Sequence, residues 1–156
     1  MKILITGGKT ATALKLIKAF DNATIILGDY GDAPSIKVNT YEFASLGPWN
    51  AEVLAHNLLT KCLDYSVDML LPLYEAEIQA VSKSLLLFEE FGLKVLSPEN
   101  PQLRSTKFKD WCVFVEGKVI YASASIQIEN SDGLNGAYAF DAETGGLVLI
   151  SIADPR

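Results

Sequence analysis

The residues that could bind a ligand lie in three turns, and each turn follows an apolar run typical of a buried strand. Backbone N–H groups of a glycine turn can bind an anion, whereas carboxylates can hold an amine or a metal ion. The candidate ligand-binding residues are Gly7, Gly8, Lys9, Thr10, Asp29, Tyr30, Glu75 and Glu77. We expect the Gly7–Gly8 turn to face an anionic group and the acids to orient polar or cationic parts of the ligand.

The glycine turn imitates the end of a phosphate-binding loop. Residues 8–10 read Gly-Lys-Thr, as in the pattern G-x-x-x-x-G-K-[ST]. The leading glycine of that pattern would stand at position 3, which is Ile3 inside the apolar run. The P-loop interpretation therefore fails.

A dinucleotide site is a second interpretation of the same turn. Thr6 and Gly7 match the start of the dehydrogenase pattern T-G-x-x-x-G-x-G. Ala11 and Ala13 replace its later glycines, and their methyl groups would crowd a pyrophosphate. Asp29 follows Gly7 at about the spacing of an acid that binds the ribose 2′-OH. NAD(P) binding stays open as an alternative, beside a simple tight turn.

The acids at positions 75 and 77 also have two interpretations. Together with Asp29 they could converge on a cationic group or a metal ion. Alternatively, Glu75 and Glu77 begin a helix, where their negative charge interacts favourably with the N-terminal end of the helix dipole.

Motifs for independent catalysis are absent from the sequence. His56 is the single histidine, and no Cys-x-x-Cys, HExxH or G-x-S-x-G pattern occurs. Cys62 and Cys112 lie far apart in apolar surroundings, which favours free buried thiols. We therefore predict no catalytic residue, no metal site and no cofactor.

The elements that position the turns predict an α/β fold. The expected strands are Lys2–Thr6, Thr24–Leu27, Tyr41–Leu46, Val67–Leu73 and Leu93–Ser97, and the expected helices are Thr10–Phe20, Asn50–Tyr65 and Glu75–Phe91. Short connections favour a Rossmann-like, doubly wound, mostly parallel sheet in the order 3-2-1-4-5. In that order the three turns share one crevice at the carboxyl edge of the sheet.

The pattern of polar and apolar residues changes after Pro98. A polar linker leads to a possible short helix, Gln102–Asp110, and then to alternating β-type segments. The expected antiparallel strands are Val113–Val115, Val119–Ile128, Tyr138–Asp141 and Leu147–Ile152. We predict a domain over residues 1–109, linker included, and a β-hairpin extension over residues 110–156 that packs on one side or end of the sheet.

Residues 1–109 resemble the N-terminal, pre-ATP-grasp domain of ATP-grasp ligases such as carbamoyl-phosphate synthase large subunits and biotin carboxylase. The segments that carry the resemblance are ILITGG, IILGDYGDAP, VDMLLPLYEAEIQAV and FGLKVLSPENPQLRSTKFKDW. The most specific segment is Pro72–Glu77, which is similar to the family's Pro-Leu-x-Asp/Glu-x-Glu. The family's Asp-Lys pair at the start of the ATP-grasp domain is here Thr106-Lys107.

Residues 108–156 are too few for an ATP-grasp domain, and they lack its phosphate loop and magnesium ligands. The resemblance therefore implies a fold, a crevice at the Gly7, Asp29 and Glu75 turns, and a role in holding an acid or amine substrate. It implies no ligase activity for this chain by itself. A separate ATP-grasp subunit is the expected partner for any such reaction.

Composition limits the remaining partners. The chain has 156 residues, 49% of them hydrophobic, which is enough for a packed core. Its net charge of −6 disfavours nucleic acid and anionic membranes. No apolar run is long enough to span a membrane and no signal peptide precedes the first strand, so we expect a cytoplasmic protein. A homodimer formed through the β extension is also expected, and a purely structural dimerising module is a third alternative.

Overall fold

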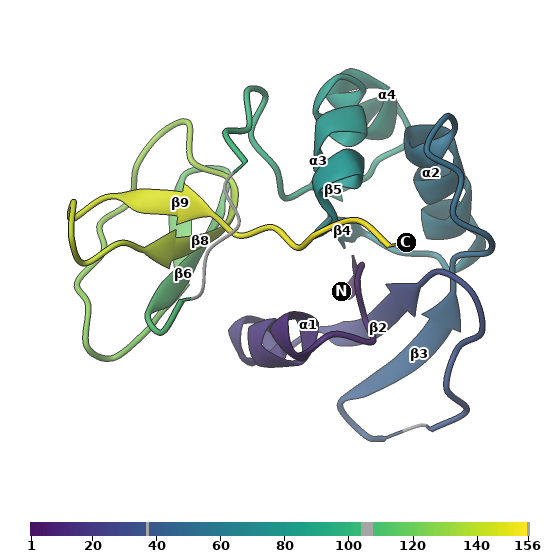
Figure 1. Ribbon diagram of the computed structural model, residues 1–156, viewed down its shortest axis with the longest axis horizontal. Coiled ribbons are helices and arrows are strands. Elements are labelled where there is room, and N and C mark those ends of the chain that lie inside the picture. Colours follow the sequence, from purple (N-terminus) through teal and green to yellow (C-terminus); the bar gives the residue numbers. More distant parts are fainter. Residues whose placement is uncertain (37, 104–107, 156) are drawn as a thin grey trace.

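The computed structural model describes residues 1–36, 38–103 and 108–155 and contains two β-sheets (Figure 1). The first sheet has five parallel strands in the order β3-β2-β1-β4-β5, which confirms the predicted order. Its strands are β1 (Lys2–Ile5), β2 (Thr24–Asp29), β3 (Tyr41–Ser45), β4 (Met69–Leu71) and β5 (Lys94–Val95). The second sheet has four antiparallel strands in the order β7-β6-β8-β9. They are β6 (Trp111–Val115), β7 (Lys118–Ala122), β8 (Gly136–Phe140) and β9 (Leu147–Leu149).

The helices of the described residues are shorter than the sequence predicted. They are α1 (Ala11–Leu16), which continues as the 3₁₀ turn η1 (Ile17–Phe20), then α2 (Leu54–Asp64), α3 (Glu75–Ser82) and α4 (Leu85–Glu90). The prediction of a single helix over Glu75–Phe91 is wrong, because the helix is interrupted between Ser82 and Leu85. Serine competes for backbone groups, and here the Ser82 hydroxyl donates to the Gln79 carbonyl. Among the residues that the structure describes, no helix is both long and apolar enough to cross a bilayer.

Two further elements differ from the predictions. The strand predicted over Val119–Ile128 ends at Ala122, because the Ser123 hydroxyl both accepts from Trp111 N and donates to Trp111 O in place of further pairing. Of the helix predicted over Gln102–Asp110, residues 104–107 lie outside the described residues, and the described residues 102–103 and 108–110 are not helical.

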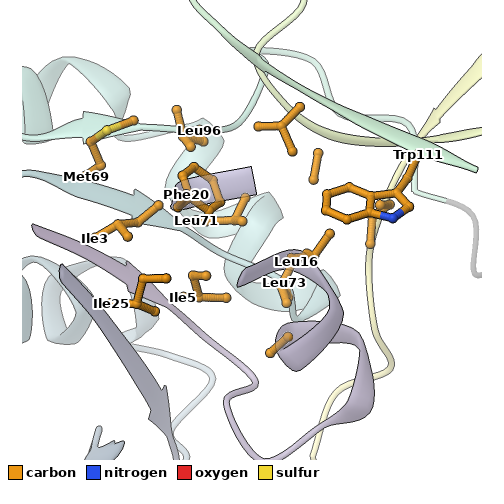
Figure 2. Close-up of a cluster of buried hydrophobic side chains, with 14 of the residues drawn as sticks. Ile3, Ile5, Leu16, Phe20, Ile25, Met69, Leu71, Leu73, Leu96 and Trp111 are labelled. Atoms are coloured by element: carbon orange, nitrogen blue, oxygen red, sulfur yellow. The ribbon is translucent and has the colours of Figure 1, made fainter. Parts of the chain in front are cut away.

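The parallel sheet is covered on both faces, as its apolar strands require. Ile3 and Ile5 of β1 pack with α1, η1 and the second sheet, whereas Leu4 packs with α2, α3 and α4. Figure 2 shows Trp111 of β6 reaching the same cluster as Leu16 of α1. Two layers of side chains thus fix the orientation of β1, at the end of which the glycine turn begins.

One face of the antiparallel sheet packs against the parallel sheet. Trp111 and Val113 join the cluster around Ile3, while Cys112 and Phe114 point the other way and pack with Ile78 of α3. The β extension therefore contacts both the parallel sheet and α3.

Alanine at Gly8 is expected to lower the free energy of unfolding by roughly 1–3 kcal/mol. A Cβ at Gly8 would lie 2.7 Å from the carbonyl carbon and the Cβ of Leu27, so β2 would have to move. Urea unfolding of Gly8→Ala measures the loss. Gly146→Ala is the control, since its nearest contact would be the Thr144 hydroxyl at 3.3 Å. Equal losses in the two variants would contradict a steric role of the turn.

Candidate functional site

The carboxyl ends of β1, β2 and β4 lie side by side, and the three predicted turns meet there. Thr6 N donates to Leu71 O over 3.1 Å, and Gly8 N donates to Gly28 O over 3.0 Å. These backbone bonds join the glycine turn to the ends of β4 and β2. The candidate residues are therefore neighbours, as the predicted strand order requires.

Glu77 is the centre of a buried hydrogen-bond network. Its Oε1 accepts from Thr6 Oγ1 at 2.6 Å and from Tyr74 N at 3.1 Å. Its Oε2 accepts from the Tyr30 hydroxyl at 2.5 Å. Burial raises the pKa of Glu77 to about 7, against the opposing effect of these three donors. Burial therefore favours the protonated form of Glu77 relative to an exposed glutamate.

Asp29 holds the same three turns from the other side. Its Oδ1 accepts from the Tyr74 hydroxyl at 2.7 Å and from Tyr30 N at 2.8 Å, and its Oδ2 accepts from Lys9 N at 3.0 Å. Burial, together with the adjacent carboxylates, raises the pKa of both tyrosine hydroxyls, so they stay protonated as donors. Asp29 is only 5% exposed and acts mainly as a positioning residue.

An aromatic wall stands beside the two acids. The Trp49 ring meets the Tyr30 ring edge to face, with centroids 4.8 Å apart, and the Tyr74 ring with centroids 5.6 Å apart. Tyr30 and Tyr74 are buried and Trp49 is half-buried. Thr6, Trp49 and Tyr74 were not among the predicted ligand-binding residues. Trp49 could have been found, because it follows the third strand at the same edge of the sheet.

The polar groups of the glycine turn form hydrogen bonds within the chain. The N–H groups of Gly8, Lys9 and Thr10 donate to Gly28 O, Asp29 Oδ2 and Gly7 O, respectively. The Thr10 hydroxyl caps α1 by accepting from Ala13 N. The Lys9 ammonium donates to Tyr30 O over 2.8 Å. Few donors of this turn remain for an anionic ligand.

Glu75 and Glu77 take different positions in the first turn of α3. Glu77 faces inward and accepts from Tyr74 N, so the helix-start alternative holds for it. The Glu75 side chain is half-buried, and its carboxylate has no hydrogen-bond or ion-pair partner among residues 1–36, 38–103 and 108–155. Within the described part of the chain, Glu75 is therefore the acid at this edge whose carboxylate is available to a ligand.

Metal and thiol chemistry find little support in this region. Over the described ranges, no group of three His, Cys, Asp or Glu side chains could hold a metal ion. Burial raises the pKa of Cys62 to about 12, with a contribution from the Glu77 charge, and that of Cys112 to about 11. Both thiols are free, buried and protonated. His56 is exposed on α2.

The molecule is thus a mixed α/β protein with a polar network at the carboxyl edge of a parallel sheet, the edge where ligands bind in such folds. The chain matches no protein-family model and no curated protein sequence.

Proposed function

We propose that this chain is a stand-alone domain of the pre-ATP-grasp type, which binds a small ligand bearing an amine or a carboxylate and is not catalytic by itself. One observation carries the proposal. Asp29 and Glu77 tie the ends of β1, β2 and β4 into one hydrogen-bonded surface at the crevice. Such preorganisation lowers the cost of holding a ligand. In a ligase reaction the domain would act with a separate ATP-grasp subunit.

The side chains at this edge of the sheet favour an amine at one end of the ligand. Glu75 offers a carboxylate that has no partner among the described residues, and Trp49 offers part of an aromatic ring to a cation. The exposed Lys9 ammonium donates to Tyr30 O, and because an ammonium has three donors it can also face a carboxylate at the other end of the ligand. An amino acid is therefore the ligand class that these groups suit best.

The glycine turn supports this choice over the dinucleotide alternative. Pyrophosphate binding uses free N–H groups of the turn, and those of Gly8, Lys9 and Thr10 donate within the chain. Both oxygens of Asp29 accept from protein donors as well, so a ribose hydroxyl would compete with them.

A thermal-shift screen tests the proposal with amino acids, diamines, small carboxylic acids, ATP with magnesium, and NAD(P)H. A probe at 100 times its Kd should add about 2.7 kcal/mol to the free energy of unfolding, which raises Tm by several degrees. We expect this rise with an amino acid, and its loss in Glu75→Gln. Glu90→Gln, at an exposed position of α4, is the charge-matched control. A rise with NAD(P)H alone would contradict the proposal.

A further inference from the structure

The segment after β9 returns to the carboxyl edge of the parallel sheet. It leaves the antiparallel sheet and crosses to the carboxyl edge over β4 (Figure 1). Ile152 forms a parallel bridge with Tyr74: its N–H donates to Leu73 O over 2.8 Å, and its carbonyl accepts from Glu75 N at 3.1 Å. The segment thus pairs with residues 73–75, which connect β4 to α3.

Two side chains anchor the segment. Ile152 lies over the glycine turn, where a Cβ at Gly7 would be 2.5 Å from Ile152 Cδ1. Gly7 also has φ +63°, so glycine satisfies both the turn and the contact. The Asp154 carboxylate accepts from Ala76 N at 2.8 Å, in the first turn of α3, where negative charge is stabilising.

Ile152 packs against both core clusters, whereas the rest of the segment is held less firmly. Ala153 and Asp154 are exposed, and Ile152 is half-buried. The Ser151 hydroxyl is buried with no hydrogen-bond partner in the part of the chain that the structure describes. A buried unpaired hydroxyl disfavours the bound position of the segment, since water would satisfy it on release. By contrast, Ile150 is buried in the core and donates to Ala137 O.

We propose that Ser151–Asp154 is a displaceable strap, which covers Gly7 and the start of α3 at the carboxyl edge of the parallel sheet and opens while both sheets stay folded. For the effect on ligands the inference rests on the proposed function. A ligand that reaches Gly7 and Ala76 must bind the open state, so its apparent Kd exceeds the intrinsic Kd by the reciprocal of the open fraction. The strap therefore sets the apparent affinity of the site for a ligand without forming part of the surface that the ligand contacts.

Hydrogen exchange on the wild-type chain tests the strap without any variant. The reporter amides are Glu75, Ala76 and Ile152, whose N–H groups are donated in the strap contacts. The reference amides are Thr6 and Ile150, which donate within the two sheets. Local opening should make the reporters exchange at least about tenfold faster than the references. Equal protection of both sets would overturn the proposal, because the segment would then open only with the whole fold.

A matched pair of variants links opening to binding. Asp154→Asn weakens the bond to Ala76 N and should speed exchange of the Ala76 amide about tenfold, with Ile150 unchanged. Glu143→Gln removes the same charge from an exposed turn and should change neither amide. Faster exchange of Ile150 in Asp154→Asn, equal to that of Ala76, would count against a separate strap.

The same variants separate the two proposals. If an amino acid binds, Asp154→Asn should lower its apparent Kd by the factor gained in opening, and an unchanged Kd would contradict the gating role. If no probe binds while the reporters exchange early, the proposed function fails and the strap stands.

Discussion

Glu77→Ala is expected to lower the free energy of unfolding by about 3–5 kcal/mol, the largest loss among the variants considered. The Glu77 side chain is 0% exposed and accepts from Thr6 Oγ1, Tyr30 OH and Tyr74 N. Its removal leaves buried donors from three different turns without an acceptor and opens a cavity between them. Urea unfolding near neutral pH measures the loss.

Glu77→Gln separates the network from side-chain volume. The amide oxygen can still accept from Thr6 and Tyr74, and the amide N–H can donate to the Tyr30 oxygen, so we expect a loss of only about 1 kcal/mol. Glu90→Ala removes an exposed acid of α4 and should change the free energy of unfolding by less than about 0.5 kcal/mol. A loss in Glu77→Ala as small as that in Glu90→Ala would show that the network does not hold the crevice together.

The order of the parallel strands was predictable because its causes are local. Strands buried on both faces give continuous apolar runs such as Ile3–Ile5, and the short connections between elements leave few topologies. The ends of elements were less predictable. Only the structure shows that the Ser82 hydroxyl bonds to its own helix and that Ser123 replaces the ladder bonds of β7.

The candidate site was predicted in part. Gly7 and Glu75 follow β1 and β4, and Asp29 is the last residue of β2, so the topology brings the three residues together. Thr6 and Tyr74 lie in apolar runs, where a hydroxyl is easily taken for a core residue. Their roles come from bonds across the fold, Thr6 to Glu77 and Tyr74 to Asp29, which no local pattern encodes.

The strap was missed for the same reason. The sequence predicted one strand over Leu147–Ile152, but β9 ends at Leu149 and Ile152 pairs with Tyr74 instead. Because Ile152 is apolar, the sequence alone does not distinguish pairing within the antiparallel sheet from pairing with Tyr74. The homodimer expected from the β extension stays a prediction, and the edges of β7 and β9 are where it would form.

The stability of the chain is expected to fall as pH rises from about 4.5 to about 7, by up to about 3 kcal/mol relative to Glu77→Gln. Burial raises the pKa of Glu77 from 4.5 in the unfolded chain to about 7 in the folded one. Between these values the folded state holds a proton that the unfolded state has released. The contribution is therefore fully present below pH 4.5 and is lost as pH rises through 7.

Urea unfolding of the wild type and of Glu77→Gln between pH 4.5 and 8 measures this dependence. Other titrating groups contribute equally to both proteins, so the difference between the two free energies of unfolding isolates Glu77. Asp29 lies in the same network, and its charge adds to the raised pKa, so Asp29→Asn should weaken the pH dependence as well. A difference that stays constant over this range would mean that Glu77 keeps one protonation state in the folded chain. Because burial disfavours the charged form while Thr6, Tyr30 and Tyr74 N favour it, the measured slope reports which effect dominates.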